Sequence, residues 1–265
     1  MPGKKLEMIG TGLALREEAY HLAERLFGNE TRAMMGFANQ LIDICTKAQG
    51  EDFLIIHNPG GWGQTPWEHC LDWERSIVQG VKATVEEMGY SSLIIQYFRT
   101  YDGWRELIRD LREQFKFFAN KAMVMAKALE FIIKHLSDLK VILVGVSQGA
   151  GFSNAVMQKL AGPYQVYSVE VGYFFPYRRW RVVTEKTLAI DSNGIMPDPV
   201  VYRNLKIGAK YLLAAPFRWL RYRLEGTPVK LSLCVDVPGH NYYWDYPEVR
   251  KQIRDFLAAK FAVDK

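Results

Sequence analysis

The chain has 265 residues, 34 of them basic and 29 acidic, which gives a formal net charge of +5; 49% of the residues are hydrophobic. This composition is that of a globular protein and excludes a disordered, collagen-like or low-complexity chain. The longest apolar stretches, such as 54–56 and 211–216, are far shorter than the roughly 18 to 20 residues that a membrane-spanning helix needs. We therefore expect no membrane span.

The cysteines and the N-terminus indicate the compartment. Cys45, Cys70 and Cys234 are odd in number and have no CxxC spacing, so they predict neither a disulfide framework nor a cysteine zinc site. The apolar part of residues 6–15 is interrupted by polar residues, and charged residues follow at 16–18, where a signal peptide would have its cleavage site. We expect a cytoplasmic protein.

The first half of the chain reads as helix followed by alternating strands and helices. A mostly helical segment covers about 14–48, and the apolar run 53–57 is typical of a buried strand that ends in a glycine-rich loop at 58–61. A helix is predicted over about 71–88, closed by Gly89 as a C-terminal cap. A second buried strand, at 92–98, precedes a helix whose apolar residues recur at three- and four-residue steps over 122–136.

The second half continues the alternation up to a final helix. The expected elements are strands at 141–144, 165–171, 187–190 and 229–237, and a helix at 148–160. For the last helix, Asp245 is the expected cap, Pro247 suits the first position, and Glu248 would complete a capping box.

This alternation predicts an α/β fold with a mostly parallel central sheet and helices on both faces. Residues 1–50 would form a helical N-terminal segment packed on the core, and 51–265 the α/β domain. The stretch from about 198 to 226 does not fit the alternation. We interpret it as a helical cap inserted before the last strand.

One motif carries chemistry. Residues 145–149 read G-x-S-x-G, with a buried strand leading in and a helix leading out. A serine on such a tight turn needs small residues two positions to either side, and the turn lifts its hydroxyl above the sheet edge. It also places Ser147 at a helix N-terminus, where backbone N–H groups favour developing negative charge. Ser147 is thus a candidate nucleophile.

The run 141–151, Val-Ile-Leu-Val-Gly-Val-Ser-Gln-Gly-Ala-Gly, resembles the α/β-hydrolase superfamily, and with the strand order and a late histidine the resemblance extends over roughly 50–265. It implies an esterase or lipase-like serine hydrolase with a catalytic triad and an oxyanion hole. The Gly-x-Ser-Gln-Gly wording also looks like cutinase-type esterases, but their disulfide-bonded, compact character is missing here.

A serine hydroxyl needs a base, and the resemblance places that base at the end of the last strand. His240 lies there, just before the final helix. The other histidines are expected to be structural or exposed: His21 and His135 lie within predicted helices, His69 begins one, and His57 ends a strand beside the presumed site.

The acid should follow a strand between the serine and the histidine, where it can fix the imidazole tautomer. Asp198-Pro-Val resembles the sequence pattern that the superfamily has at its acid position. Asp191 lies almost at the end of the strand 187–190 and could instead cap the Asn-Gly turn. We favour Asp198 over Asp191. Glu170 and Asp236 remain alternatives because each lies on or beside a strand in this half.

An acyl-transfer site also needs donors for the oxyanion. The first is the N–H of Gln148, the residue after the nucleophile. The second should come from the loop 58–63; Pro59 has no N–H, which leaves Gly61 or Trp62.

The excess positive charge of the chain is concentrated in one segment. Residues 178–230 hold eleven basic and four acidic side chains, a balance of +7, so the rest of the chain is −2. Aromatic residues are interleaved with these charges. Arg218, Trp219 and Arg221 are the candidate substrate-binding residues, on a surface that could contact an acyl chain, an anionic substrate or peripheral lipid; a solvated lid face is the alternative. No nucleic-acid-binding motif accompanies the patch.

The leading hypothesis is a serine hydrolase that cleaves a carboxylic ester through an acyl-enzyme: Ser147 attacks, His240 transfers the proton and Asp198 orients His240. An acyltransferase or thioesterase with the same triad, and a non-catalytic α/β-hydrolase-like binding protein, are the alternatives. There is no HxH, HExxH, P-loop or strand-linked GxGxxG motif, so neither a metal nor another cofactor is expected.

Overall fold

A computed structural model describes residues 2–99, 112–203, 205–226 and 237–262 of the chain. In chain order its elements are α1 (Pro2–Phe27), α2 (Thr31–Lys47), β1 (Phe53–Asn58), the 3₁₀ helix η1 (Trp67–His69), α3 (Asp72–Glu87), β2 (Ser92–Gln96), α5 (Ala119–His135), β3 (Lys140–Val146), α6 (Gln148–Lys159), β4 (Val166–Val171), the 3₁₀ helix η2 (Phe175–Trp180), β5 (Thr187–Ile190), α7 (Leu205–Leu224) and α8 (Pro247–Phe261).

The five strands form one parallel sheet in the order β2-β1-β3-β4-β5. Every residue of β1 is buried, as the continuous apolar run predicts for a strand covered on both faces. Alternate residues point to opposite faces: Leu54 and Ile56 join one hydrophobic cluster, Phe53 and Ile55 the other. The prediction of an α/β fold with helices on both sheet faces is confirmed.

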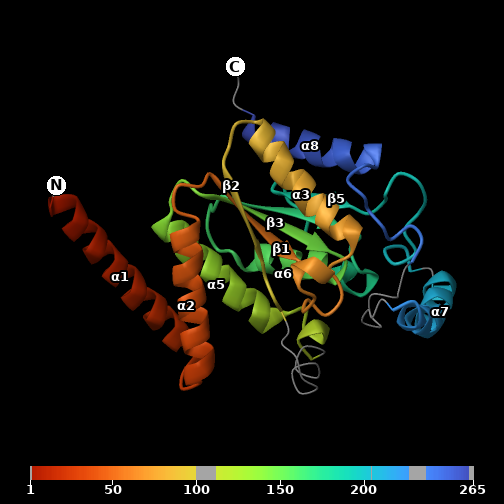
Figure 1. Ribbon diagram of the computed structural model, residues 1–265, viewed down its shortest axis with the longest axis horizontal. Coiled ribbons are helices and arrows are strands. Elements are labelled where there is room, and N and C mark those ends of the chain that lie inside the picture. Colours follow the sequence, from red (N-terminus) through yellow and green to blue (C-terminus); the bar gives the residue numbers. More distant parts are fainter. Residues whose placement is uncertain (1, 100–111, 204, 227–236, 263–265) are drawn as a thin grey trace.

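The two faces carry different helices. Buried residues of α1, α2, α5 and α6 belong to the first cluster, and those of α3 and α8 to the second. Figure 1 shows α3 and α8 together over one side of the sheet and α2 and α5 toward the other. In α5 the buried residues include Ala122, Met125, Ala126, Leu129 and Ile132, which recur at the three- and four-residue steps seen in the sequence.

The N-terminal helical segment is two helices that turn at Gly28, which has a positive φ of 55°. Both contribute to the first cluster, through Ala19 and Ala23 of α1 and Leu41 and Cys45 of α2. In Figure 1 the first half of α1 extends away from the sheet. The N-terminal segment thus packs on the core, beside α5, through the second half of α1 and through α2.

The strand order places a topological switch point between β1 and β3. After β1 the chain goes to α3 on one face of the sheet, and after the neighbouring β3 it goes to α6 on the other face. The loops that leave β1 and β3 therefore diverge at the carboxyl ends of the strands, and such a switch point is where open α/β sheets bind ligands. Here the two loops are the glycine-rich segment 58–63 and the turn at Ser147.

One local prediction is confirmed and two are wrong. Gly89 follows α3 with a φ of +93° and its N–H bonds to Glu86 O, as a C-terminal cap should. The start of α8 differs from prediction: Tyr246, rather than Asp245, is the capping residue and makes no side-chain cap bond. Glu248 is then the second helical residue, one position too early for a capping box, and instead binds Gln252.

The helix expected in the insertion is α7, which spans most of that segment. The strand expected at 229–237 lies outside the described residues, apart from its last residue, Val237. Among the described residues no helix is both long and apolar enough to cross a membrane.

Candidate active site

Ser147 lies on the sharp turn between β3 and α6. Its backbone has φ 52° and ψ −114°, a conformation that costs an L-residue on the order of 1–3 kcal/mol. The turn is held by the Ser147 N–H, which donates to Val171 O on β4 at 2.9 Å, and by Ser147 O, which accepts from Ala150 N at 3.1 Å. The residue is partly exposed. This strained turn presents the hydroxyl at the carboxyl edge of the sheet.

The two glycines of the motif are required for packing. A β-carbon on Gly145 would lie 2.5 Å from Gly149 O, across the turn as the sequence predicts. A β-carbon on Gly149 would lie 2.0 Å from Asn58 O, which belongs to the neighbouring strand β1. The second glycine therefore allows α6 to approach β1, a reason that the sequence alone does not reveal.

His240 is bonded to Asp198. Its Nδ1 lies 2.7 Å from Asp198 Oδ2, with the imidazole 14% exposed and the carboxylate fully buried. The other oxygen of Asp198 accepts from the N–H groups of Val200 at 2.7 Å and Val201 at 3.3 Å. Because an ionised carboxylate can only accept a hydrogen bond, Nδ1 carries the ring hydrogen, which leaves Nε2 as the basic nitrogen.

Two aromatic residues complete the surroundings of this pair. The Tyr242 hydroxyl donates to Asp198 Oδ2 at 2.6 Å, and burial, with the Asp198 charge second, strongly raises the pKa of that phenol. The Trp73 ring meets the imidazole edge to face at 6.0 Å. Sequence reasoning missed both residues; a tyrosine two positions after the candidate base was the only signal.

The His240 imidazole and the Ser147 backbone both lie next to the end of β4. Val171 O binds the Ser147 N–H, and a β-carbon on the next residue, Gly172, would lie 2.9 Å from His240 Cε1. Gly172 thus has no side chain because the imidazole occupies that space. No hydrogen bond joins Ser147 Oγ to His240 within the described part of the chain, and bonds of this kind often tighten only when substrate binds.

Close packing of two loops positions His240. Gly239, with φ +88°, allows the contact, since a β-carbon there would lie 2.7 Å from Pro197 O in the loop that carries Asp198. Asn193 ties the same loops together, its Nδ2 donating to Asn241 O at 3.0 Å, while its Oδ1 accepts from the N–H of Ile195 at 2.9 Å. The relative position of the two loops, which carry Asp198 and His240, therefore depends on contacts with backbone atoms.

The alternative acids have other partners. Both oxygens of Asp191 accept from Arg181 Nη1 at 2.8 Å, and Arg181 Nε donates to Glu170 Oε2 at 3.1 Å. The hypothesis that Asp191 caps the Asn-Gly turn is wrong, because Asn193 and Ser192 hold that turn. Burial raises the pKa of Glu170 to about 7 despite its partners. Asp236 lies outside the described residues.

The glycine-rich loop lies beside Ser147. A β-carbon on Gly60 would be 3.7 Å from Ser147 Cβ, whereas one on Gly61 would have nothing within 4 Å. The buried Arg99 holds the loop in place. Its side-chain Nη2 donates to Gly61 O at 2.6 Å, and its backbone N–H donates to Gly63 O at 2.9 Å. The loop residue next to the serine is thus Gly60, one position before the predicted donors Gly61 and Trp62. Gln148 begins α6 as predicted.

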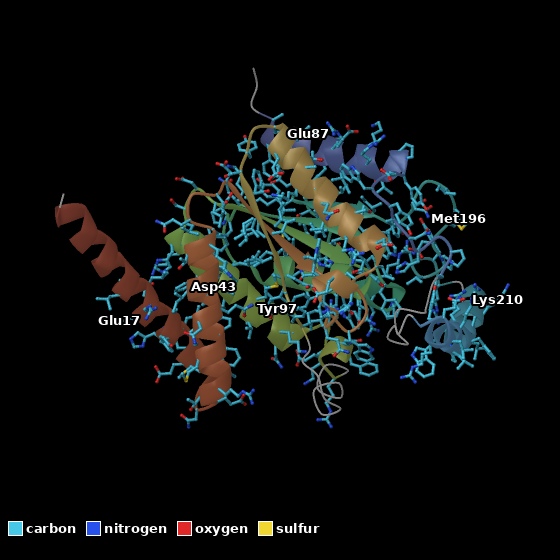
Figure 2. The ribbon with its side chains drawn as sticks, viewed as in Figure 1. Glu17, Asp43, Glu87, Tyr97, Met196 and Lys210 are labelled. Atoms are coloured by element: carbon cyan, nitrogen blue, oxygen red, sulfur yellow. The ribbon has the colours of Figure 1, made fainter. Side chains whose placement is uncertain are left out.

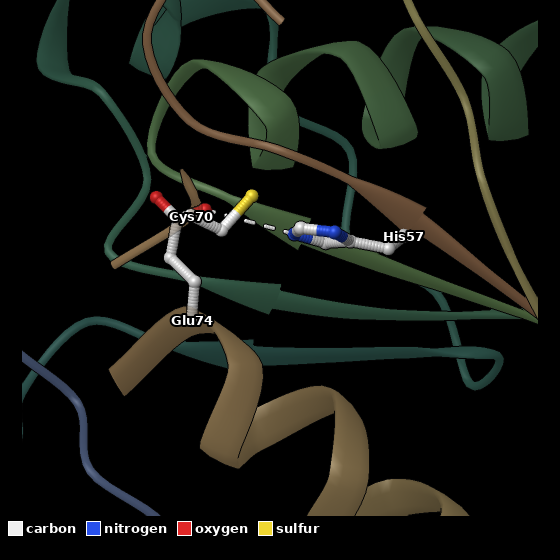
Figure 3. A group of neighbouring side chains, drawn as sticks. All are labelled: His57, Cys70 and Glu74. Carbon is white, nitrogen blue, oxygen red and sulfur yellow. Dashed lines mark ion pairs between the residues drawn. The ribbon is translucent and has the colours of Figure 1, made fainter. Parts of the chain in front are cut away.

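Beneath this loop lies a buried group that could hold a metal ion. His57 is the second-to-last residue of β1, Glu74 lies in the first turn of α3 and Cys70 follows η1. One ligand atom from each lies within 4.8 Å of the others (Figure 3). His57 Nε2 is 3.7 Å from Glu74 Oε2. Burial, followed by the nearby Glu74 charge, raises the pKa of the Cys70 thiol to about 12. Sequence spacing did not reveal this cluster.

The predicted substrate-binding residues lie on α7, on the side of the molecule toward which the strands point (Figure 1). Arg221 pairs with Glu225 one turn on, at 2.7 Å, and Arg223 stacks over the Trp219 ring at 4.6 Å. Arg218 is half-buried. Two other basic residues of this region have partners. Arg181 pairs with the Glu170 carboxylate, and the Arg179 guanidinium stacks 3.8 Å from the centre of the Trp180 ring.

Comparison with models of known protein families finds no match, and no curated protein is significantly similar to the chain.

Proposed function

We propose that the protein is a serine hydrolase of the α/β-hydrolase type that cleaves a carboxylic ester through an acyl-enzyme. The observation that carries the proposal is the buried Asp198–His240 pair, bonded at 2.7 Å, at the same sheet edge as Ser147 on its strained turn. The strand order, with the serine after the central strand, supports it. A structural serine has no need for a left-handed backbone, so the strain itself favours a functional role.

In the proposed reaction Ser147 Oγ attacks the ester carbonyl carbon while His240 Nε2 takes its proton. The carbonyl oxygen becomes an oxyanion, which the Gln148 N–H and an N–H of the Gly60–Trp62 stretch stabilise. The C–O bond to the alcohol then breaks, and His240 gives its proton to the leaving oxygen. Water attacks the acyl-serine with His240 again as base, which releases the carboxylic acid and restores the hydroxyl.

The test is covalent labelling. A fluorophosphonate probe should modify the folded protein once, at Ser147, and Ser147→Ala should abolish the label. Ser137→Ala is the matched control and should label normally, because this exposed serine precedes the amino end of β3, whereas Ser147 follows its carboxyl end. Absence of label on folded protein, or label at another residue, contradicts the proposal.

Turnover then separates the related activities. A hydrolase releases acid from short esters in water alone, and rates over esters of increasing acyl length, with thioesters and amides for comparison, define the substrate. An acyltransferase forms the same acyl-serine but releases product only when an alcohol, thiol or amine acceptor is added. A binding protein without catalytic function forms no acyl-serine.

A further inference from the structure

We propose that His57, Cys70 and Glu74 bind a divalent transition-metal ion of the zinc class beneath the glycine-rich loop. The three side chains come from a strand end, a loop and a helix start, and they point toward one another in Figure 3. They are 0%, 5% and 7% exposed, respectively. Residues from separate elements thus converge on one point inside the protein.

The spacing suits a tetrahedral ion. Metal–ligand bonds of about 2.0–2.3 Å place neighbouring ligand atoms about 3.5 Å apart. His57 Nε2 and Glu74 Oε2 are already 3.7 Å apart, and all three ligand atoms lie within 4.8 Å of one another. Side-chain rotations that shorten the longer of these distances to about 3.5 Å would close the site. A water molecule would complete the coordination.

The second observation is the unsatisfied histidine. Among the residues that the structure describes, neither ring nitrogen of the fully buried His57 has a hydrogen-bond partner. Leaving a buried polar group unpaired costs about 1–3 kcal/mol, so such a group calls for an explanation such as an ion. Imidazole nitrogen, thiolate sulfur and carboxylate oxygen together favour zinc or cobalt over magnesium or calcium, which prefer oxygen alone.

Such an ion would also affect the neighbouring serine. A β-carbon on Gly60 would lie 2.8 Å from Glu74 Oε1 and 3.7 Å from Ser147 Cβ, so the Glu74 carboxylate lies just behind the loop that faces the serine. A bare negative charge there would oppose an oxyanion. A bound cation neutralises it and links the end of β1 to the start of α3. This consequence rests on the proposed function, whereas the metal site itself does not.

The experiment measures metal binding in the Ser147→Ala protein, so its result is independent of hydrolysis. Chelator-treated protein should take up Zn²⁺ at a 1:1 ratio, by elemental analysis after desalting. Co²⁺ should give a thiolate-to-cobalt charge-transfer band, which Cys70→Ser removes. Cys45→Ser is the control, because Cys45 is also a buried free cysteine but lies in α2; it should keep the band.

Thermal melting provides the second measurement. Added Zn²⁺ should raise the melting temperature of the parent and of Cys45→Ser by several degrees, but not that of Cys70→Ser or Glu74→Gln, provided that both variants melt cooperatively without metal. Failure to retain Zn²⁺, or a cobalt spectrum that Cys70→Ser leaves unchanged, would overturn the proposal and leave a buried His57–Glu74 pair.

A different observation supports a second inference, that the outer face of α7 rests on an anionic lipid surface. Leu213, Phe217, Leu220 and Leu224 are 72%, 77%, 52% and 80% exposed. Their spacing of four, three and four residues places them along one side of the helix. Ala215, on the opposite side, is buried. Four adjacent large apolar side chains in water exceed what scattered surface residues explain.

The charges flanking this apolar stripe select the occupant. At about 100° per residue, Lys210 and Arg221 lie about 50° and 70° to one side of its centre, and Arg223 about 90° to the other. Figure 2 shows Lys210 on the outer rim of α7. The described part of α7 (Leu205–Leu224) contains no acidic residue, and Glu225 just beyond it pairs with Arg221. An apolar face bordered by cations suits the interface of an anionic bilayer.

Vesicle co-sedimentation tests this inference. The protein should bind phosphatidylcholine vesicles that contain phosphatidylglycerol, more weakly as salt is added, and bind pure phosphatidylcholine little. Phe217→Ser with Leu224→Ser should weaken binding at least tenfold. Ile195→Ser, at a residue 62% exposed outside α7, is the control and should have no effect.

Two results would overturn it. One is the absence of binding to anionic vesicles at low salt. The other is a dimer in gel filtration that the Phe217→Ser, Leu224→Ser pair dissociates, which would assign the apolar stripe to a contact between copies of the chain.

Discussion

Asp198→Asn tests the candidate triad most directly, because the structure determines how the amide must lie. Asp198 Oδ1 accepts two backbone N–H groups, and Oδ2 faces His240 Nδ1 and the Tyr242 hydroxyl. An asparagine keeps its oxygen toward the two N–H donors, since turning its NH₂ group there would oppose donor to donor in a fully buried place. The NH₂ group then faces His240.

The imidazole must respond to that change. Nδ1 can only accept from the NH₂ group, so the ring proton moves to Nε2, the nitrogen that should receive the proton of Ser147. The base is then in the wrong tautomer while the geometry persists. For such a change in a triad the fall in kcat is about 10⁴-fold, equivalent to about 5.4 kcal/mol in the activation free energy.

The assay is the steady-state hydrolysis of a short activated ester, with the melting temperature as a check on folding. Asp191→Asn is the matched control: the amide oxygen still accepts from Arg181, so activity should fall less than tenfold. Near-normal turnover in Asp198→Asn, or a larger loss in Asp191→Asn, would refute the assignment of Asp198 as the acid.

Two further predictions concern buried polar groups. Tyr242→Phe removes a hydrogen bond to the Asp198 carboxylate, which should lower the free energy of unfolding in urea by roughly 1.5–3 kcal/mol and reduce kcat about tenfold with KM unchanged; an unchanged stability would contradict the role given to this bond. Burial raises the pKa of Glu170 from 4.5 to about 7, so the folded protein holds this proton more tightly than the unfolded chain. Glu170 therefore makes stability fall as pH rises between these values, and Glu170→Gln should remove that slope in urea titrations at about pH 5 and pH 8. Parallel pH profiles of the two proteins would contradict this pKa direction.

The sequence by itself determined the layers of the fold and one part of the site. Continuous apolar runs and helical periodicity are local properties, so β1, β3, α3 and α5 could be predicted from them. The turn at Ser147 was equally predictable, because a strand, two glycines and a helix within a few residues leave one local geometry. The prediction of the α8 cap failed because it relied on residue type alone: Asp245 is the usual capping residue, yet the helix begins one residue later, after Tyr246.

Only the tertiary structure decided which residues meet. Asp191 and Asp198 are near-equivalent in sequence, and the difference is that Arg181 pairs with the first while His240 contacts the second. Likewise His57, Cys70 and Glu74 carry no recognisable spacing, yet the parallel sheet and the start of α3 bring them within 4.8 Å. Such groupings depend on distances between elements far apart in the chain. Local sequence patterns specify each element and contain no information about those distances.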